Sequence, residues 1–261
     1  MAHLGIRYEV GISHATNQDA CCFKSASTLD GEVVLAVICD GVGGLELGEL
    51  ASSSVASAFS AWFEGELPAI LQDDNIELMR GVKSSWSRLL QNLDEAIRLY
   101  GEEFGGSLAT TCTAMLCAKR SYLIAHVGDC RVYELLGPSQ KQLTEDQTLL
   151  ARELARGAIT PEEAKTFPGE NIILQAIGAP NGIVPSFYTG SVREGAIYIL
   201  ATDGAYRKPG NAGVAAAFAD TAPSDESLTR ACGALVETAL GLGETDNLTA
   251  LAFSTAGGGD A

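Results

Sequence analysis

Five aspartates, each beside an apolar segment, are the side chains of this chain most able to do chemistry. Asp40 and Asp203 each end an apolar run and precede a glycine, and Asp129 ends another run. Asp246 stands just before an apolar run, and Asp19 lies near the N-terminus. Any one of them is explained by a turn, since Asp is frequent in turns. Together they have the composition of a two-metal site, in which carboxylates and a backbone carbonyl hold two hard cations.

The segment around Asp40 is where this chemistry would centre. Val33 to Cys39 is an unbroken run of apolar or small residues, which is typical of a strand buried on both faces. Asp40-Gly41 ends the run, and glycine allows a metal or a phosphate to approach the backbone. A dinucleotide site has a similar outline, but G-x-G-x-x-G counted from Gly41 would need glycine where Glu46 stands. An ordinary strand–turn–helix junction is the other interpretation of this stretch.

The histidine and cysteine content limits the kind of metal. The three histidines, His3, His14 and His126, are too few for a histidine-rich site. The seven cysteines include no C-x-x-C pair, so a zinc site or a disulfide framework is disfavoured. Free, mostly buried thiols in a reducing cytosol are expected instead. Any metal would be held by oxygen, which favours magnesium or manganese.

Composition excludes some partners. The chain has 261 residues, 46% of them hydrophobic, which is enough for a substantial core. Its formal net charge of −16 argues against non-specific binding to nucleic acid or to an anionic membrane, and suits divalent cations or basic partners. No apolar run has the length of a membrane span, and the N-terminal sequence lacks the layout of a signal peptide.

Hydrophobic periodicity predicts runs of strands and pairs of helices. Strands are predicted at Ile6–Ile12, Ala20–Ser25, Glu32–Cys39, Ala109–Ala118, Ser121–Val127, Arg131–Leu136, Ala196–Thr202 and Leu248–Ser254. Helices are predicted at Glu49–Phe63, Ile76–Phe104, Gln147–Arg156 and Ser224–Leu240, with a helix start at Thr160; the second has an apolar face that includes Trp86 and Phe104. Because strands and helices do not alternate strictly, the pattern favours an α+β layered domain over a doubly wound parallel sheet. No linker or repeat divides the chain, and the Gly-rich tail 255–261 is expected to be loose.

Short motifs follow one another along the chain in a fixed order. They are Asn17-Gln18-Asp19, Asp40-Gly41-Val42-Gly43-Gly44 with Gly48-Glu49 and Ala51-Ser52, Gly106-Ser107-Leu108-Ala109-Thr110-Thr111, Val127-Gly128-Asp129-Cys130-Arg131, Leu143-Thr144 with Asp146, Ala176-Ile177-Gly178, Ala201-Thr202-Asp203-Gly204, and Asp246-Asn247-Leu248-Thr249. In these motifs the chain resembles the protein phosphatase 2C family, the metal-dependent serine/threonine phosphatases, in its compact bacterial form. The resemblance covers nearly the whole chain.

The resemblance implies a fold and an activity. The fold would be α+β, a four-layer α/β/β/α sandwich of two antiparallel sheets flanked by helix pairs. A single catalytic domain would span residues 1–254, with a flap at about 149–172 beside the cleft. The activity would be hydrolysis of phosphoserine and phosphothreonine in proteins by a water that bridges two divalent ions, manganese or magnesium, with room for a third, weaker site.

Residue roles also follow from the resemblance. Asp40 would bridge the two metals, and the carbonyl of Gly41 would bind one of them. Asp203 and Asp246 would bind the other metal, so Asp40, Asp203 and Asp246 are the predicted catalytic residues. Asp19 would act mostly through metal-bound water.

Two more residues receive roles in the same way. Asp129, with Asp203, would hold the third metal, and Asn247 would orient its neighbour. Two cations that activate water and screen the phosphoryl oxygens make a cysteine or serine nucleophile unnecessary, and none is arranged as one.

The chain departs from the family pattern at several positions. Where this chain has His14, family members usually carry an arginine that grips the substrate phosphate. An imidazole is a poorer phosphate ligand than a forked guanidinium, so His14 either grips phosphate more weakly or is a solvated loop residue. Val42 stands where some members have a histidine proposed as general acid, and Gln147 where relatives often have histidine. His126 is expected to be a packing residue, and Glu49 is not taken as a ligand, since a carboxylate at a helix start is favoured by the dipole.

Two other functions stay open from the sequence. A catalytically weak or silent phosphoprotein-binding domain of the same fold is supported only by His14, and uncompensated carboxylates would cost such a domain stability. A two-metal hydrolase of another substrate, such as a nucleotide, lacks a basic or aromatic base-binding stretch. The leading interpretation implies a cytoplasmic location and, as partners, phosphorylated proteins that are targets of a cytoplasmic Ser/Thr kinase. The oligomeric state stays open, with a monomer favoured.

Overall fold

The structure is a computed structural model that describes residues 1–42, 47–73, 77–104, 108–169 and 171–255. The predicted helix start Ile76, the motif residues Gly43, Gly44, Gly106 and Ser107, and nearly all of the tail 255–261 lie outside these ranges. Within them, no helix combines the length and the apolar character needed to cross a membrane.

The strand that ends at Asp40 is an inner strand of the first sheet. In β3 (Gly31–Cys39) every side chain from Val33 to Cys39 is buried, as an apolar run without polar alternation predicts. β3 pairs antiparallel with β2 (Ala20–Thr28) and β6 (Cys112–Ala118). The complete order is β10-β7-β6-β3-β2, with β7 (Ser121–Val127) and β10 (Ser186–Ser191).

The second sheet is also antiparallel and contains both described ends of the chain. Its order is β1-β12-β11-β8-β9, formed by β1 (His3–Glu9), β12 (Leu248–Ser254), β11 (Ile197–Ala201), β8 (Arg131–Leu136) and β9 (Ser139–Gln142). A separate pair of short strands, β4 (Gly41–Val42) and β5 (Ala109–Thr110), directly follows Asp40.

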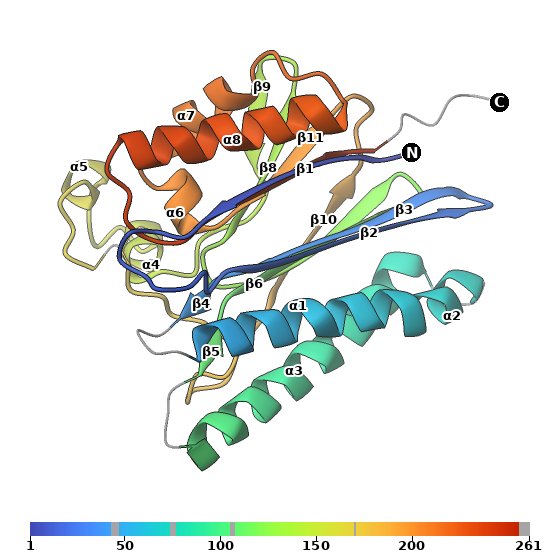
Figure 1. Cartoon of the computed structure of the whole chain (residues 1–261). Coiled ribbons are helices and arrows are strands. Elements are labelled where there is room, and N and C mark those ends of the chain that lie inside the picture. The colour runs from blue at the N-terminus through green and yellow to red at the C-terminus, as the bar shows by residue number, and fades with distance from the viewer. Residues whose placement is uncertain (43–46, 74–76, 105–107, 170, 256–261) are drawn as a thin grey trace.

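Helices cover the outer face of each sheet (Figure 1). α1 (Gly48–Gly65), α2 (Leu67–Gln72) and α3 (Leu78–Phe104) lie on the first sheet, and α6 (Asp203–Tyr206), α7 (Gly210–Phe218) and α8 (Asp225–Gly241) lie on the second. The segment expected to form the flap carries α4 (Leu149–Ala155) and α5 (Pro161–Ala164). Thr160, the predicted helix start, is the N-cap of α5 and forms a capping box with Glu163. The predicted four-layer α/β/β/α sandwich is therefore confirmed.

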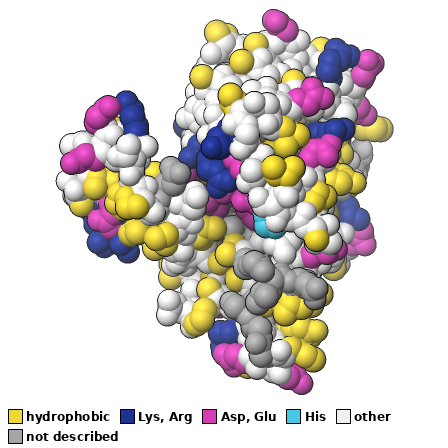
Figure 2. Space-filling model, turned by 60° about the vertical axis from the view of Figure 1, so that its left-hand side comes forward, with side chains coloured by type: hydrophobic (Ala, Val, Ile, Leu, Met, Phe, Trp, Pro, Cys, Tyr) yellow, Lys and Arg dark blue, Asp and Glu magenta, His cyan; other side chains and the backbone are white. Residues whose placement is uncertain are grey.

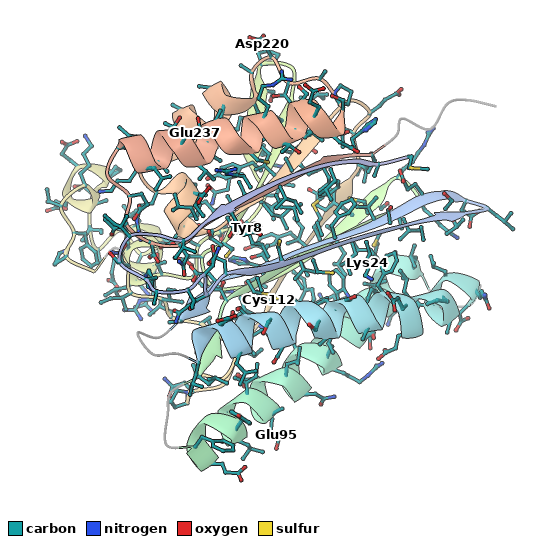
Figure 3. The ribbon with its side chains drawn as sticks, viewed as in Figure 1. Tyr8, Lys24, Glu95, Cys112, Asp220 and Glu237 are labelled. Carbon is teal, nitrogen blue, oxygen red and sulfur yellow. The ribbon has the colours of Figure 1, made fainter. Side chains whose placement is uncertain are left out.

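Apolar side chains fill the three spaces between these layers (Figure 3). On α1 the apolar positions recur at helical spacing, and Phe59 and Trp62 lie against Trp86 of α3 with ring centroids 5.3 and 5.4 Å apart. Trp86 is fully buried, as predicted, whereas Phe104 at the end of the same helix is 61% exposed, so its placement on the core face was wrong.

Several predicted boundaries differ from the structure for identifiable reasons. The first strand is His3–Glu9 and not Ile6–Ile12, because its pairing with β12 ends where Glu9 meets Leu248. The single strand predicted over Ala109–Ala118 is two strands, because the Thr111 amide donates to the Asp40 carbonyl at 2.8 Å.

The elements missed altogether are β4, β9, β10, α2, α6 and α7. β9 and β10 are edge strands in which no residue is fully buried, so their sequences lack an apolar run.

The aromatic contact between α1 and α3 generates a stability prediction. Trp86→Ala removes a fully buried indole and should lower the free energy of unfolding by about 3–5 kcal/mol. Urea denaturation followed by circular dichroism measures the change. Leu99→Ala, at a half-exposed position of the same helix, is the matched control and should cost less than about 1 kcal/mol. Equal losses in the two variants would contradict this account of the core.

Candidate functional site

The structure brings the five predicted aspartates together at one edge of the two sheets. Asp40 follows β3 of the first sheet, while Asp203 follows β11 and Asp246 precedes β12 of the second. Burial raises the pKa of Asp40 well above its usual range, and the charges of Asp19, Asp203, Asp129 and Asp246 raise it further. Because a carboxylate is affected in this way only by close neighbours, these five residues form one acid cluster.

Two threonines hold Asp19 within the acid cluster. Its Oδ2 accepts hydrogen bonds from Thr249 Oγ1 at 2.6 Å and from Thr202 Oγ1 at 3.0 Å. Burial nevertheless raises the pKa of Asp19 to about 7, against the lowering effect of the two threonines. Both threonines belong to the sequence motifs, but the sequence alone did not predict that they bind Asp19.

The backbone of Asp40 is fixed by the short β4–β5 pair. The Asp40 amide donates to Thr111 Oγ1 at 2.9 Å, and the Asp40 carbonyl accepts from the Thr111 amide and from Thr110 Oγ1. The next residue, Gly41, has no room for a side chain, since a Cβ there would lie 2.7 Å from the carbonyl oxygens of Gln18 and Gly48. The Asp40 carboxylate is thus held on a backbone that cannot easily shift.

The loops that carry Asp19 and Asp246 are tied together by Asn247. Its Oδ1 accepts from the Gln18 amide at 2.8 Å, and its Nδ2 donates to the Thr16 carbonyl at 3.3 Å. The Asn247 backbone amide donates to Asp246 Oδ1 at 2.8 Å.

Three cluster carboxylates have a buried oxygen that makes no hydrogen bond to the described residues: Asp19 Oδ1, Asp129 Oδ1 and Asp203 Oδ1. Such atoms normally have a partner, and an all-oxygen donor set fits a hard divalent cation. Among the residues described, however, no three His, Cys, Asp or Glu side chains already have the geometry to hold one ion. By its composition and its unpartnered buried oxygens, the acid cluster fits a divalent cation.

Basic side chains also lie at the acid cluster. Arg207, which the sequence interpretation missed, contacts Asp203 Oδ2 through Nη1 at 2.5 Å and lies 3.6 Å from Asp246 Oδ2. His14 Nε2 lies 3.0 Å from Asp246 Oδ1, so the imidazole faces the cluster and is only partly exposed. Basic and acidic side chains gather in a hollow on this side of the molecule, with a histidine beside them (Figure 2).

A cavity of about 150 Å³ adjoins the cluster and is lined by residues that include Asp129, Asp203, Arg207 and the flap residue Asn171. Arg131 also lines the cavity, but its guanidinium already has partners. Its Nη2 lies 2.6 Å from Asp146 Oδ2, and its Cζ lies 3.9 Å from the centroid of the Tyr206 ring.

The remaining sequence-predicted residues have structural partners. His126 is fully buried and its Nδ1 lies 2.8 Å from Thr113 Oγ1, while burial lowers its pKa to about 4, so it is the packing residue that was predicted. Gln147 Oε1 accepts from the Gly128 amide at 2.8 Å and so supports the turn that presents Asp129.

Comparison with known proteins supplies the family. The protein phosphatase 2C family model matches residues 11–242. The chain therefore belongs to the protein phosphatase 2C family, which confirms the predicted family and the predicted phosphatase class of enzyme.

Individual relatives agree with this assignment. The chain is 30% identical over 222 residues to a serine/threonine phosphatase of Listeria welshimeri, covering 83% of this chain and 82% of the relative. It is 29% identical over 215 residues to protein phosphatase PhpP of Streptococcus pneumoniae, covering 82% of each. The catalytic domain of the phosphatase PstP, solved with two manganese ions, superposes with a TM-score of 0.76 at 25% identity and covers 98% of this chain and 99% of that one.

The raised pKa values of the cluster aspartates predict that the stability of the metal-free protein depends on pH. Burial, above all, raises the pKa of Asp19 to about 7 and of Asp129 to about 8, from 3.8. Between about pH 4 and pH 8 the folded state therefore keeps protons that the unfolded state releases, so the stability of the metal-free protein should fall as pH rises through this window. Thermal unfolding in chelator at pH 5 and pH 8 measures it, and manganese should raise the melting temperature more at pH 8.

Two matched variants test the cause of this trend. Asp19→Asn should reduce the loss of stability between pH 5 and pH 8. Asp220→Asn, at an exposed position far from the cluster, should leave it unchanged (Figure 3). Metal-free protein that becomes more stable with pH across this range would contradict the protonated cluster.

Proposed function

We propose that this protein is a metal-dependent phosphatase that hydrolyses phosphoserine and phosphothreonine in proteins. The observation that carries the proposal is the meeting of five aspartates from both sheets, some with buried oxygens that lack a described partner. A relative named as a serine/threonine phosphatase supports the substrate class. Nothing in the described residues favours a catalytically silent domain, since uncompensated carboxylates would only cost it stability.

In this proposal Asp40 would hold both of two divalent ions, and the Gly41 carbonyl would hold one of them. Asp203 and Asp246 would hold the other, and Asp19 would contribute through water. The ions are manganese or magnesium, supported by the oxygen donor set and by the manganese in PstP. When bound, they would activate a water and screen the charge of the phosphate.

The chain's own part is to hold these carboxylates rigidly and to supply no competing nucleophile. Thr110 and Thr111 fix the Asp40 backbone, so the point from which its carboxylate extends does not shift when charge is added. Cys39, which directly precedes Asp40, and Cys130, which directly follows Asp129, are fully buried, and burial raises their pKa well above the usual range. They stay protonated and unreactive, which leaves water as the nucleophile.

The finer parts of the proposal concern the third metal and the partners. Asp129, whose Oδ1 has no described partner, would hold a third, weaker ion with Asp203. The substrates would be phosphoproteins made by a cytoplasmic Ser/Thr kinase, and a monomer suffices because the acid cluster comes from one chain. A reducing, cytoplasmic location is supported by seven unpaired cysteines, five of them buried.

The bridging role of Asp40 is tested by Asp40→Asn. Removing the charge that would join two cations should lower kcat/KM by about two orders of magnitude or more and leave circular dichroism unchanged. Hydrolysis of p-nitrophenyl phosphate and of a phosphothreonine peptide, with manganese and with chelator, measures it, and Asp220→Asn is the control. Near-normal turnover in Asp40→Asn would refute the two-metal assignment. Peptide binding without hydrolysis in the parent would refute the phosphatase proposal.

The third site is tested by Asp129→Ala. If Asp129 serves only a weaker ion, this variant should keep two tightly bound manganese ions by calorimetry and lose most of its activity on the phosphothreonine peptide. Loss of a tight site in the titration would show that Asp129 belongs to the principal pair.

A further inference from the structure

Arg207 lies at a position that brings a guanidinium onto the acid cluster. It directly follows α6, whose first residue is Asp203, and its amide donates to the Asp203 carbonyl at 2.8 Å. The two side chains are one helical turn apart and therefore share a face. Nη1 lies 2.5 Å from Asp203 Oδ2 and 3.4 Å from Oδ1 of the flap residue Asn171.

The opposite edge of the guanidinium is held by Glu244. Arg207 Nη2 donates to Glu244 Oε1 at 3.0 Å, and Nε donates to Oε2 at 3.3 Å. Glu244 is only 4% exposed, and its Oε1 also accepts from the amides of Thr245 and Asp246 at 2.8 and 3.2 Å. Backbone amides thus position this carboxylate, and the carboxylate in turn positions Arg207.

The two edges of Arg207 respond differently to metal. Cations on Asp203 and Asp246 would offset the attraction that holds Nη1 at the cluster and would repel the guanidinium. Glu244 is not among the proposed metal ligands, so its two-bond pair with Nε and Nη2 persists. Nη1 would then stay next to the cations and would have an N–H free to donate. A phosphate bound to those cations would place its oxygens within reach of this donor.

We propose that Arg207 binds the substrate phosphate once divalent cations occupy the acid cluster, and that Glu244 is the positioning residue that holds it there. This inference rests on the proposed function and gives it a phosphate ligand at the C-cap of α6. The other basic side chains at the cluster fit the role less well. Arg131 is engaged by Asp146 and Tyr206, and His14 offers a single ring nitrogen that already meets Asp246.

Binding of inorganic phosphate to the manganese-loaded protein tests the proposal without relying on turnover. Arg207→Met should raise the Kd for phosphate, measured by calorimetry, at least about tenfold through the loss of a charge-assisted contact. The same variant should bind manganese more tightly than the parent, because a cation has been removed from Asp203 and Asp246. Arg230→Met, which removes an equal charge from an exposed pair on α8, should change neither constant.

If Arg207 binds phosphate, Arg207→Met weakens phosphate binding and strengthens manganese binding. If Arg207 is only structural, the variant does not change the two affinities in opposite directions. Unchanged phosphate affinity in Arg207→Met, or no phosphate binding by the manganese-loaded parent, would overturn the proposal. Weakening of both constants would also overturn it, since general damage to the site acts that way. Arg207→Lys keeps the charge but loses the fork, and should give an intermediate Kd for phosphate even if the methionine variant folds poorly.

Glu244 is tested through its partner. Glu244→Gln keeps an oxygen for the two backbone amides and should weaken phosphate binding in the parent but not in the Arg207→Met background. An equal effect in both backgrounds would show that Glu244 does not act through Arg207.

Kinetics then separates this inference from the proposed function. If the protein hydrolyses p-nitrophenyl phosphate, Arg207→Met should raise KM more than it lowers kcat, since a phosphate contact acts in both ground and transition states. A kcat loss with unchanged KM would count against the contact. Phosphate binding that depends on Arg207, in a protein that hydrolyses no phosphoester, would sustain the inference and refute the phosphatase proposal.

Discussion

The crowding of five carboxylates into one partly buried cluster is the constraint on which the rest of the structure depends. Burial, above all, raises the pKa values of Asp19, Asp40 and Asp129, and the charges of neighbouring aspartates raise them further. A flexible chain would relieve this repulsion by letting the carboxylates move apart. Here Asp19 is held by Thr202 and Thr249 and the Asp40 backbone by Thr110 and Thr111, so bound protons or cations, and not movement of the chain, reduce the repulsion.

The two-sheet architecture is what makes this crowding sustainable. Asp40 ends a strand of one sheet and Asp203 follows a strand of the other, so the distance between them depends on how the sheets pack. Ile38 and Leu200, which lie two and three residues before these aspartates, are both fully buried in the apolar layer between the sheets. The close-packed apolar layer therefore fixes the strands that carry the aspartates. The free energy gained by burying this layer offsets the electrostatic cost of the acid cluster.

The sequence predicts those parts of the structure that leave a pattern among neighbouring residues. The apolar run before Asp40 identified β3, helical spacing identified the core face around Trp86, and ordered motifs identified the family and the five aspartates that meet. Edge strands β9 and β10 were missed because each pairs with a strand on one side only and contains no fully buried residue, which leaves no apolar run in the sequence. Arg207 and Glu244 were missed for a different reason: they are 37 residues apart, and only the fold shows that they form a pair.

The geometry around Asp246 bears on why histidine at position 14 is compatible with Arg207. His14 Nε2 lies 3.0 Å from Asp246 Oδ1, and Arg207 Nη2 lies 3.6 Å from Asp246 Oδ2. An arginine at position 14 would place a second permanent positive charge against the same carboxylate, and both charges would oppose an incoming divalent cation. An imidazole can make the contact without a permanent charge, because its neutral form still has a donor nitrogen. In this chain, a guanidinium anchored by Glu244 and an imidazole at position 14 therefore allow a cation into the cluster more easily than two guanidinium groups would.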